Sequence, residues 1–154
     1  MRIRIIGEGK AKDRHLSALQ ADYTKSIAHF TELIVQESKP PRGDRKRSEG
    51  KTESHWLQLL EKLQGSTKVL LDSRGREWTS QEFAEWLGQH ALRGTRELVF
   101  LLAGPDGFSE PIRQQADLLL SLSRMTLTRD WARTLLLEQI YRGFTILRGY
   151  PYPR

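Results

Sequence analysis

The residues of this 154-residue chain that could bind or transform a ligand lie in loops that follow apolar runs. Gly104 and Gly107 enclose Pro105-Asp106 directly after the run ELVFLLA. Two glycines so close together either allow the backbone to approach a small ligand closely or form a tight turn. The loop lacks the GxGxxG and GxxxxGK(S/T) patterns, so it is not predicted to cradle a pyrophosphate.

A second candidate segment is Leu122–Leu127 (LSRMTL), at the end of an apolar run that starts at Leu118. We expect residues 118–127 to form a strand, although Ser, Arg and Thr interrupt what a fully buried strand would keep apolar. Either the segment exposes its backbone at a ligand site, or the strand lies at a sheet edge. In an open α/β sheet, ligands bind beyond the carboxyl ends of the strands. The loops after residues 72, 103 and 127 are therefore expected to converge.

The charged residues favour a phosphate-bearing partner. The chain has 25 Lys and Arg against 19 Asp and Glu, a formal net charge of +6, and every basic residue after Lys68 is an arginine. Arginine pairs bidentately with phosphate and stacks on bases, which indicates RNA. Biased codon usage in a GC-rich genome would give the same excess. The absence of cysteine excludes disulfides, thiolate metal sites and cysteine nucleophiles.

The elements that must position these loops alternate between strands and helices. Apolar runs predict strands over residues 2–7, 31–37, 68–72, 97–103 and 118–127. Apolar residues at helical spacing predict helices over residues 16–27, 52–63, 110–116 and 131–148, and a further helix opened by a Thr79–Glu82 capping box. This alternation predicts one α/β domain, residues 1–154, with a mostly parallel sheet flanked by helices. The basic stretch 38–51 is predicted as a mobile loop, and residues 73–77 as a turn.

The sequence also bears on the compartment of the protein. No apolar stretch approaches the roughly 20 residues that a membrane span needs, and the opening MRIRIIGEGKAKD has no signal-peptide core. We therefore expect a soluble, cytoplasmic protein with no membrane partner and no bound metal.

Several long stretches resemble one known family. They are LAGPDGF at 102–108, LSLSRMTL at 120–127 and LLLEQIYRGFTILRGYPY at 135–152, and the opening IIGEGKAKD fits the same register. On these residues the chain resembles the ribosomal RNA large subunit methyltransferase H family of the SPOUT superfamily. The resemblance implies a homodimeric α/β fold with a C-terminal trefoil knot. It also implies that S-adenosylmethionine is used to methylate N(3) of a pseudouridine in 23S rRNA on the ribosome.

The resemblance further implies a set of cofactor-binding residues. They are Leu71, Ala103, Gly104, Leu122, Ser123, Arg124, Met125, Thr126 and Leu127. Apolar walls for the adenine and backbone groups for its edge suit this cofactor and require no metal. Ala103 stands where the family usually has the first glycine of a pair.

The C-terminal segment is expected to supply the RNA-facing groups. Our hypothesis is that Arg142 and Arg154 hold phosphate or the uracil oxygens, and that Tyr152 stacks on the base or hydrogen-bonds to it. An ion pair from Arg142 to Glu138, one helical turn away, is the alternative. In a dimer, the tail of one subunit would complete the site of the other.

Two departures from the family pattern leave a second function open. This chain has Thr128-Arg129 where the family commonly has Pro-His, and Pro153 where it commonly has a histidine. The alternative is a catalytically impaired paralogue that binds RNA or the ribosome, and loss of S-adenosylmethionine binding would identify it. A nucleotide-dependent oxidoreductase is a third reading, disfavoured by the missing GxGxxG pattern.

Overall fold

All five strands of the computed structural model, which describes residues 1–39 and 45–152, form one sheet. The strands are β1 (Arg2–Glu8), β2 (Glu32–Ser38), β3 (Thr67–Glu77), β4 (Glu97–Leu102) and β5 (Leu118–Ser121). Their order is β2-β1-β4-β3-β5, and every neighbouring pair is parallel. All six residues of the central strand β4 are buried, as its apolar run predicts.

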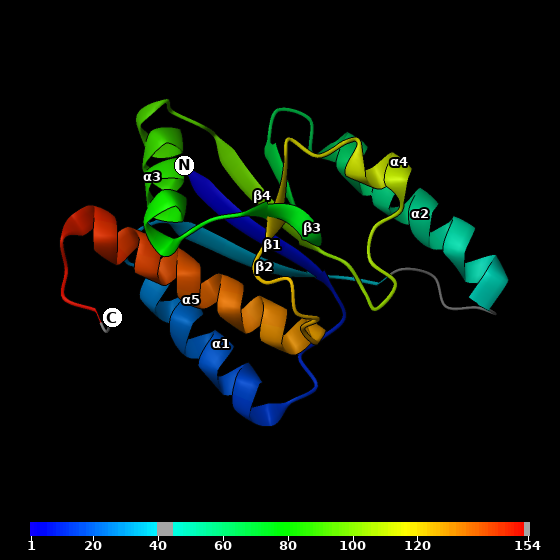
Figure 1. The fold of residues 1–154 in the computed structure, drawn as a ribbon, viewed down its shortest axis with the longest axis horizontal. Coiled ribbons are helices and arrows are strands. Elements are labelled where there is room, and N and C mark those ends of the chain that lie inside the picture. Colours follow the sequence, from blue (N-terminus) through cyan, green and yellow to red (C-terminus); the bar gives the residue numbers. More distant parts are fainter. Residues whose placement is uncertain (40–44, 153–154) are drawn as a thin grey trace.

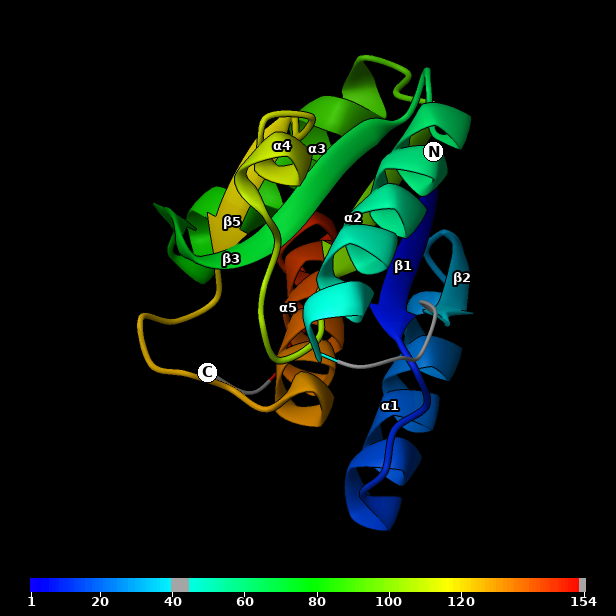
Figure 2. The same cartoon turned by 90° about the vertical axis from the view of Figure 1, so that its right-hand side faces the viewer.

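Helices cover both faces of this sheet (Figure 1). They are α1 (Arg14–Ile27), α2 (Arg45–Lys62), α3 (Ser80–Leu92), α4 (Glu110–Arg113) and α5 (Arg129–Arg148). Figure 2 shows α2 and α4 on one face, with α1, α3 and α5 behind the sheet. Successive strand residues point to opposite faces, so Ile5 joins the core under α1, α3 and α5, while Ile6 joins the core under α2 and α4. The predicted α/β class with a parallel sheet is confirmed.

Short-range signals set several helix ends. At the start of α3, the Thr79 hydroxyl accepts from the backbone N–H of Glu82, and the Glu82 carboxylate accepts from the N–H of Thr79 at 2.7 Å. The predicted capping box is therefore confirmed. At the end of α5, Gly149 adopts φ 65°, a left-handed conformation that ends the helix and redirects the tail.

The predicted turn over residues 73–77 is wrong, because β3 continues to Glu77. Both Leu71 and Arg76 are in register with Leu120 of β5, so the residues between them form a bulge. At the centre of this bulge, Gly75 lies directly against the backbone of Leu119, where no side chain fits.

Two other sequence-based boundaries are also wrong. The strand predicted over residues 118–127 ends at Ser121, and residues 122–127 form a loop instead. The stretch 38–51, predicted as a loop, is partly helical, because α2 begins at Arg45. Residues 40–44 of this stretch lie outside the residues that the structure describes. The C-terminal trefoil knot stays a prediction.

Candidate functional site

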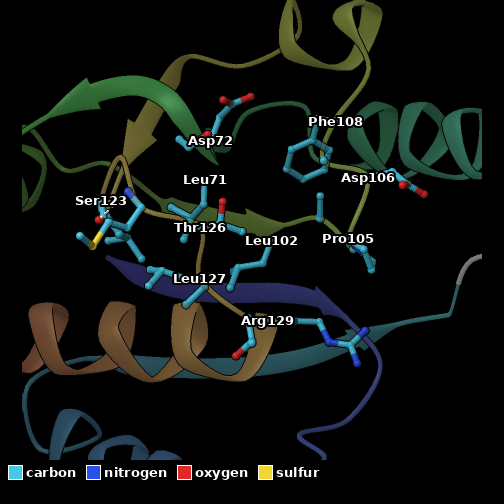
Figure 3. A pocket seen from close by; sticks show the side chains of 18 of the residues that line it. Leu71, Asp72, Leu102, Pro105, Asp106, Phe108, Ser123, Thr126, Leu127 and Arg129 are labelled. Atoms are coloured by element: carbon cyan, nitrogen blue, oxygen red, sulfur yellow. Dashed lines mark hydrogen bonds between the residues drawn. The ribbon is translucent and has the colours of Figure 1, made fainter.

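Two loops and the bulged part of β3 meet at the carboxyl edge of the sheet and line a cavity of about 940 Å³. They are the segment after Leu71 in β3, the segment 103–108 after β4, and the segment 122–129 between β5 and α5. Figure 3 shows Leu71, Leu102 and Leu127 pointing into the same space, between Asp72 and Arg129. The volume lies within the range of ligand pockets, and the convergence expected from the strand order is confirmed.

Most of the residues expected to bind the cofactor line this cavity. They are Leu71, Ala103, Gly104, Leu122, Ser123, Met125, Thr126 and Leu127. Arg124, the remaining member of the expected set, is not part of the lining. Its side chain is 84% exposed and forms an ion pair with Glu77 at 3.4 Å. The sequence therefore located the cavity, but it did not distinguish this arginine from its neighbours.

Hydrogen bonds shape the loop that follows β5. The Ser121 hydroxyl donates to the carbonyl oxygen of Ser123 at 3.0 Å, and the Ser123 hydroxyl accepts from the backbone N–H of Met125 at 3.0 Å. These two serines turn the chain away from β3 and end the strand. The polar residues that interrupt the apolar run thus form a turn beside the cavity. The strand that precedes them, β5, lies at the edge of the sheet, so both expected explanations of the interruption apply.

The aromatic ring of Phe108 anchors the loop that follows β4. Phe108 is 5% exposed and packs edge-on against Trp56 of α2, with 5.1 Å between ring centroids. Near the start of the same loop, a side chain at Gly104 would collide with the Glu8 carboxylate at the end of β1. The packing of Phe108 and the close approach of Gly104 to Glu8 therefore fix the position of backbone 103–107, which forms one wall of the cavity.

Asp72 is a cavity residue that the sequence-based reasoning did not single out. Its carboxylate lies 3.0 Å from Arg113 Nε of α4 and accepts from the backbone N–H of Arg74 at 2.8 Å. Burial opposes its ionisation, but these partners outweigh burial and hold the pKa of the Asp72 carboxyl below its ordinary value. An acidic residue directly after a buried apolar strand is the signal that could have identified it.

These features fit S-adenosylmethionine. The leucines supply apolar walls for an adenine, and the loop backbones at 103–107 and 122–127 supply hydrogen-bonding groups for its edge. The ionised Asp72 carboxylate offers an acceptor for hydroxyl or ammonium groups. Within the described residues, no cluster of three or more His, Asp or Glu side chains could hold a metal ion.

The RNA-facing candidates lie elsewhere on the chain. Arg142 donates to Glu138 Oε1 from Nε at 2.9 Å and Nη2 at 2.6 Å, and its guanidinium lies 4.7 Å from the centre of the Tyr152 ring. Arg154 lies outside the described residues. Neither Arg142 nor Tyr152 lines the cavity. Arg142 lies 13 positions after Arg129, which lines the cavity, and this offset corresponds to about 20 Å along α5.

The Tyr152 hydroxyl belongs to a small polar cluster between α1 and α5. It lies 3.0 Å from the Tyr23 hydroxyl and 3.3 Å from Glu138 Oε1. Burial and the hydrogen bond with Tyr23 raise the pKa of Tyr152 well above its ordinary value, so the phenol stays protonated. Tyr152 is therefore suited to stacking and hydrogen bonding, and it is not suited to accepting a proton at neutral pH.

One further finding concerns membranes. Across residues 1–39 and 45–152, no helix is both long enough and apolar enough to cross a bilayer.

Comparisons with known proteins agree with this geometry. A family model described as "Predicted SPOUT methyltransferase" matches residues 1–153. The chain is 39% identical over 153 residues to a protein of Geobacter sp. (strain M21) named "Ribosomal RNA large subunit methyltransferase H". The aligned region covers 99% of this chain and 98% of that protein. A protein of the same name from Trichlorobacter lovleyi is 38% identical, with 99% of each chain covered.

Solved structures show the same fold at lower identity. The chain resembles the crystal structure of a methylase family protein from Neisseria gonorrhoeae with a TM-score of 0.54 and 16% identity. The match covers 99% of this chain and 85% of that one.

Proposed function

The chain belongs to the SPOUT methyltransferase family, and from this premise we propose that it methylates N(3) of a pseudouridine in 23S ribosomal RNA. S-adenosylmethionine is the methyl donor. The observation that carries the proposal is the full-length similarity to proteins named ribosomal RNA large subunit methyltransferase H. The substrate is a ribosomal one, so we propose that the protein acts in the cytoplasm.

The bound cofactor supplies an electrophilic methyl group. Loops 103–107 and 122–127 bind it, and the leucine side chains exclude water from its adenine. Holding the donor in line with the target nitrogen lowers the barrier because it replaces a chance encounter between two molecules. The imide N–H must also lose its proton, which passes to solvent water. Tyr152 stays protonated, so its part is to orient the base.

We propose that the active enzyme is a homodimer. Arg142 lies about 20 Å along α5 from Arg129 at the cavity of its own chain, and the Tyr152 ring packs on Arg142. Both are too far to contact a base positioned for transfer there. A two-fold partner can bring its own tail, residues 150–154, to this cavity. In that arrangement Arg142, Tyr152 and Arg154 of one subunit hold the base, while the other subunit holds the cofactor.

A mixed-dimer experiment tests this arrangement. One variant, Thr126→Trp, fills the cavity from an exposed loop position. The other ends after Gly149 and lacks the tail. Each is expected to be inactive as a homodimer. If both are refolded together, half of the dimers are mixed, and each mixed dimer has one intact site built from both chains. About a quarter of wild-type activity should therefore return.

Activity is measured as transfer of a radiolabelled methyl group to ribosomes from a strain that lacks the endogenous enzyme. A site built within one chain would leave the mixture inactive, because no subunit then has both parts. Full activity of the tail-truncated variant alone would exclude a role for Tyr152 and Arg154. Failure of either variant to form dimers is detected by size-exclusion chromatography before the assay.

A further inference from the structure

Two arginines at the start of α5 face the loop between β1 and α1. Arg129 and Arg133 are one helical turn apart, so they lie on the same face of α5. Arg133 is only 3% exposed, and its Nη2 donates to the carbonyl oxygen of Gly9 at 3.1 Å. The Arg129 guanidinium borders the same glycine: a Cβ built there would lie 3.4 Å from Nη1.

Within the described residues, neither arginine forms an ion pair with a carboxylate. The Nε atoms of both arginines are buried and have no hydrogen-bond partner among those residues. The neighbouring acid, Asp130, is already engaged, since its Oδ2 accepts from the backbone N–H groups of Lys12 at 2.8 Å and Asp13 at 2.9 Å. Glu37 and Asp130 attract Arg133 electrostatically, but no described carboxylate lies within ion-pair distance of either guanidinium group.

The arrangement opposes the stability of the free protein. Burial and the nearby charge of Arg129 lower the pKa of Arg133. Like charges one helical turn apart repel each other, and the first turn of a 20-residue helix adds further positive potential. A bound anion would remove the repulsion and would also satisfy the buried Nε donors.

The position of Arg129 and Arg133 beside the cavity indicates which kind of anion they would bind. Lys12 and Arg129 both line the cofactor cavity. Figure 3 shows the Arg129 guanidinium pointing away from the centre of the cavity, toward the end of β1. An anion bound here would lie at the outer rim, where a polymer that delivers a base to the cavity would pass. A planar guanidinium matches a phosphate with two parallel hydrogen bonds.

We propose that Lys12, Arg129 and Arg133 form a binding site for a backbone phosphate of the substrate RNA, at the rim of the cofactor cavity. The site rests on the proposed function, because it assumes that RNA enters the cavity. It positions the strand through its phosphate, and the cavity and the tail hold the base. Arg133 is the buried part of the site, and Arg129 and Lys12 are its accessible part.

The salt dependence of ribosome binding tests the site without requiring methyl transfer. The probe is the 70S ribosome from a strain that lacks the endogenous enzyme. Each cation that contacts a phosphate contributes about 0.7–0.9 to the slope of log K against log salt concentration. Arg129→Ala should reduce this slope by about that amount and weaken binding roughly tenfold at moderate salt. Lys12→Ala should act in the same direction.

The matched control is Arg93→Ala, which removes the same charge from an exposed position at the far end of α3. It should leave both the slope and the affinity unchanged. Arg129→Lys should restore the slope, because lysine carries the same charge. It should restore only part of the affinity, because lysine lacks the planar guanidinium that forms two parallel hydrogen bonds. Affinity for S-adenosylhomocysteine is measured for each variant, together with thermal unfolding as a check on folding.

Three results decide the matter. Equal slopes for wild type and Arg129→Ala would overturn the phosphate site. A loss of S-adenosylhomocysteine affinity in Arg129→Ala, with ribosome binding intact, would also overturn it, since the anion would then be the carboxylate of the cofactor. If Arg129-dependent ribosome binding is seen but wild type transfers no methyl group, the phosphate site stands and the proposed function fails.

Discussion

Replacing Gly75 by alanine tests how the bulge in β3 supports the cavity. A Cβ at this position would lie 2.6 Å from the carbonyl carbon of Leu119 and 2.7 Å from its oxygen. Both atoms belong to the backbone of β5, so they cannot turn aside as a side chain would. Forcing a methyl group into a packed site typically costs about 1–3 kcal/mol. For a chain of this length, the melting temperature should fall by about 2–12 °C.

The same change should weaken cofactor binding. β5 ends at Ser121 and leads directly into the cavity loop 122–127, so moving β5 away from β3 displaces that loop. We expect Gly75→Ala to bind S-adenosylhomocysteine severalfold more weakly by calorimetry, in addition to its lower melting temperature. Both effects share one cause, and a second substitution that merely restores stability elsewhere should leave the affinity loss in place.

Gly50→Ala is the matched control. Gly50 lies within α2 with nothing within 4 Å of a built Cβ, so alanine should stabilise the helix by about 0.5–1 kcal/mol and leave cofactor affinity unchanged. A Gly75→Ala protein that melts and binds as wild type does would refute the close β3–β5 contact and its role in shaping the cavity.

Two other predictions concern the cavity walls. The pKa of Asp72 is depressed in the folded protein, so its ionisation stabilises the fold above its ordinary pKa. That contribution is lost as the pH falls below about 5. Urea titrations should therefore show a steeper loss of unfolding free energy on acidification for wild type than for Asp72→Asn. Equal slopes would contradict the stabilisation of the ionised Asp72 carboxylate by Arg74 and Arg113. Phe108→Ala removes a buried ring packed on Trp56 and should cost about 3–5 kcal/mol. It should also weaken S-adenosylhomocysteine binding, and an unchanged affinity would show that the ring does not anchor the loop.

The sequence predicted the elements whose signals are local. The Thr79–Glu82 capping box sets the start of α3, and apolar runs mark β1 and β4. Strand direction followed from the alternation of strands and helices, and the expected meeting of loops at the carboxyl edge followed from strand direction. These features depend on short stretches of chain, so one sequence contains enough information to predict them.

Features that depend on distant contacts were missed. Residues 73–77 resemble a turn, and only their pairing with β5 across the bulge makes them a strand. Residues 122–127 resemble a strand, and only two serine hydrogen bonds turn them into a loop. The start of α2 lies in a basic segment whose Pro and Gly residues favoured a loop, although Lys and Arg are also good helix formers.

The candidate site shows the same division. The family resemblance led to the cavity residues, but it did not separate Arg124, which pairs with Glu77, from residues that line the cavity. The ion pair of Arg142 with Glu138 was predicted as an alternative, and it is present. Spacing on one helix was enough for that pair. That the start of α5, at Arg129, lines the cavity while Arg142 does not required the three-dimensional arrangement of α5 against the sheet.

The most direct test of the proposed function is to map the methyl group. Purified protein is incubated with labelled S-adenosylmethionine and ribosomes that lack the modification, with Thr126→Trp as the inactive control, and the labelled nucleotide is identified by nuclease digestion and mass spectrometry. One methyl group per ribosome, on N(3) of a pseudouridine in 23S rRNA, is the predicted result. Label on another nucleotide, or none at all from a protein that binds the ribosome, would contradict the proposed function; the second outcome would identify a catalytically impaired paralogue.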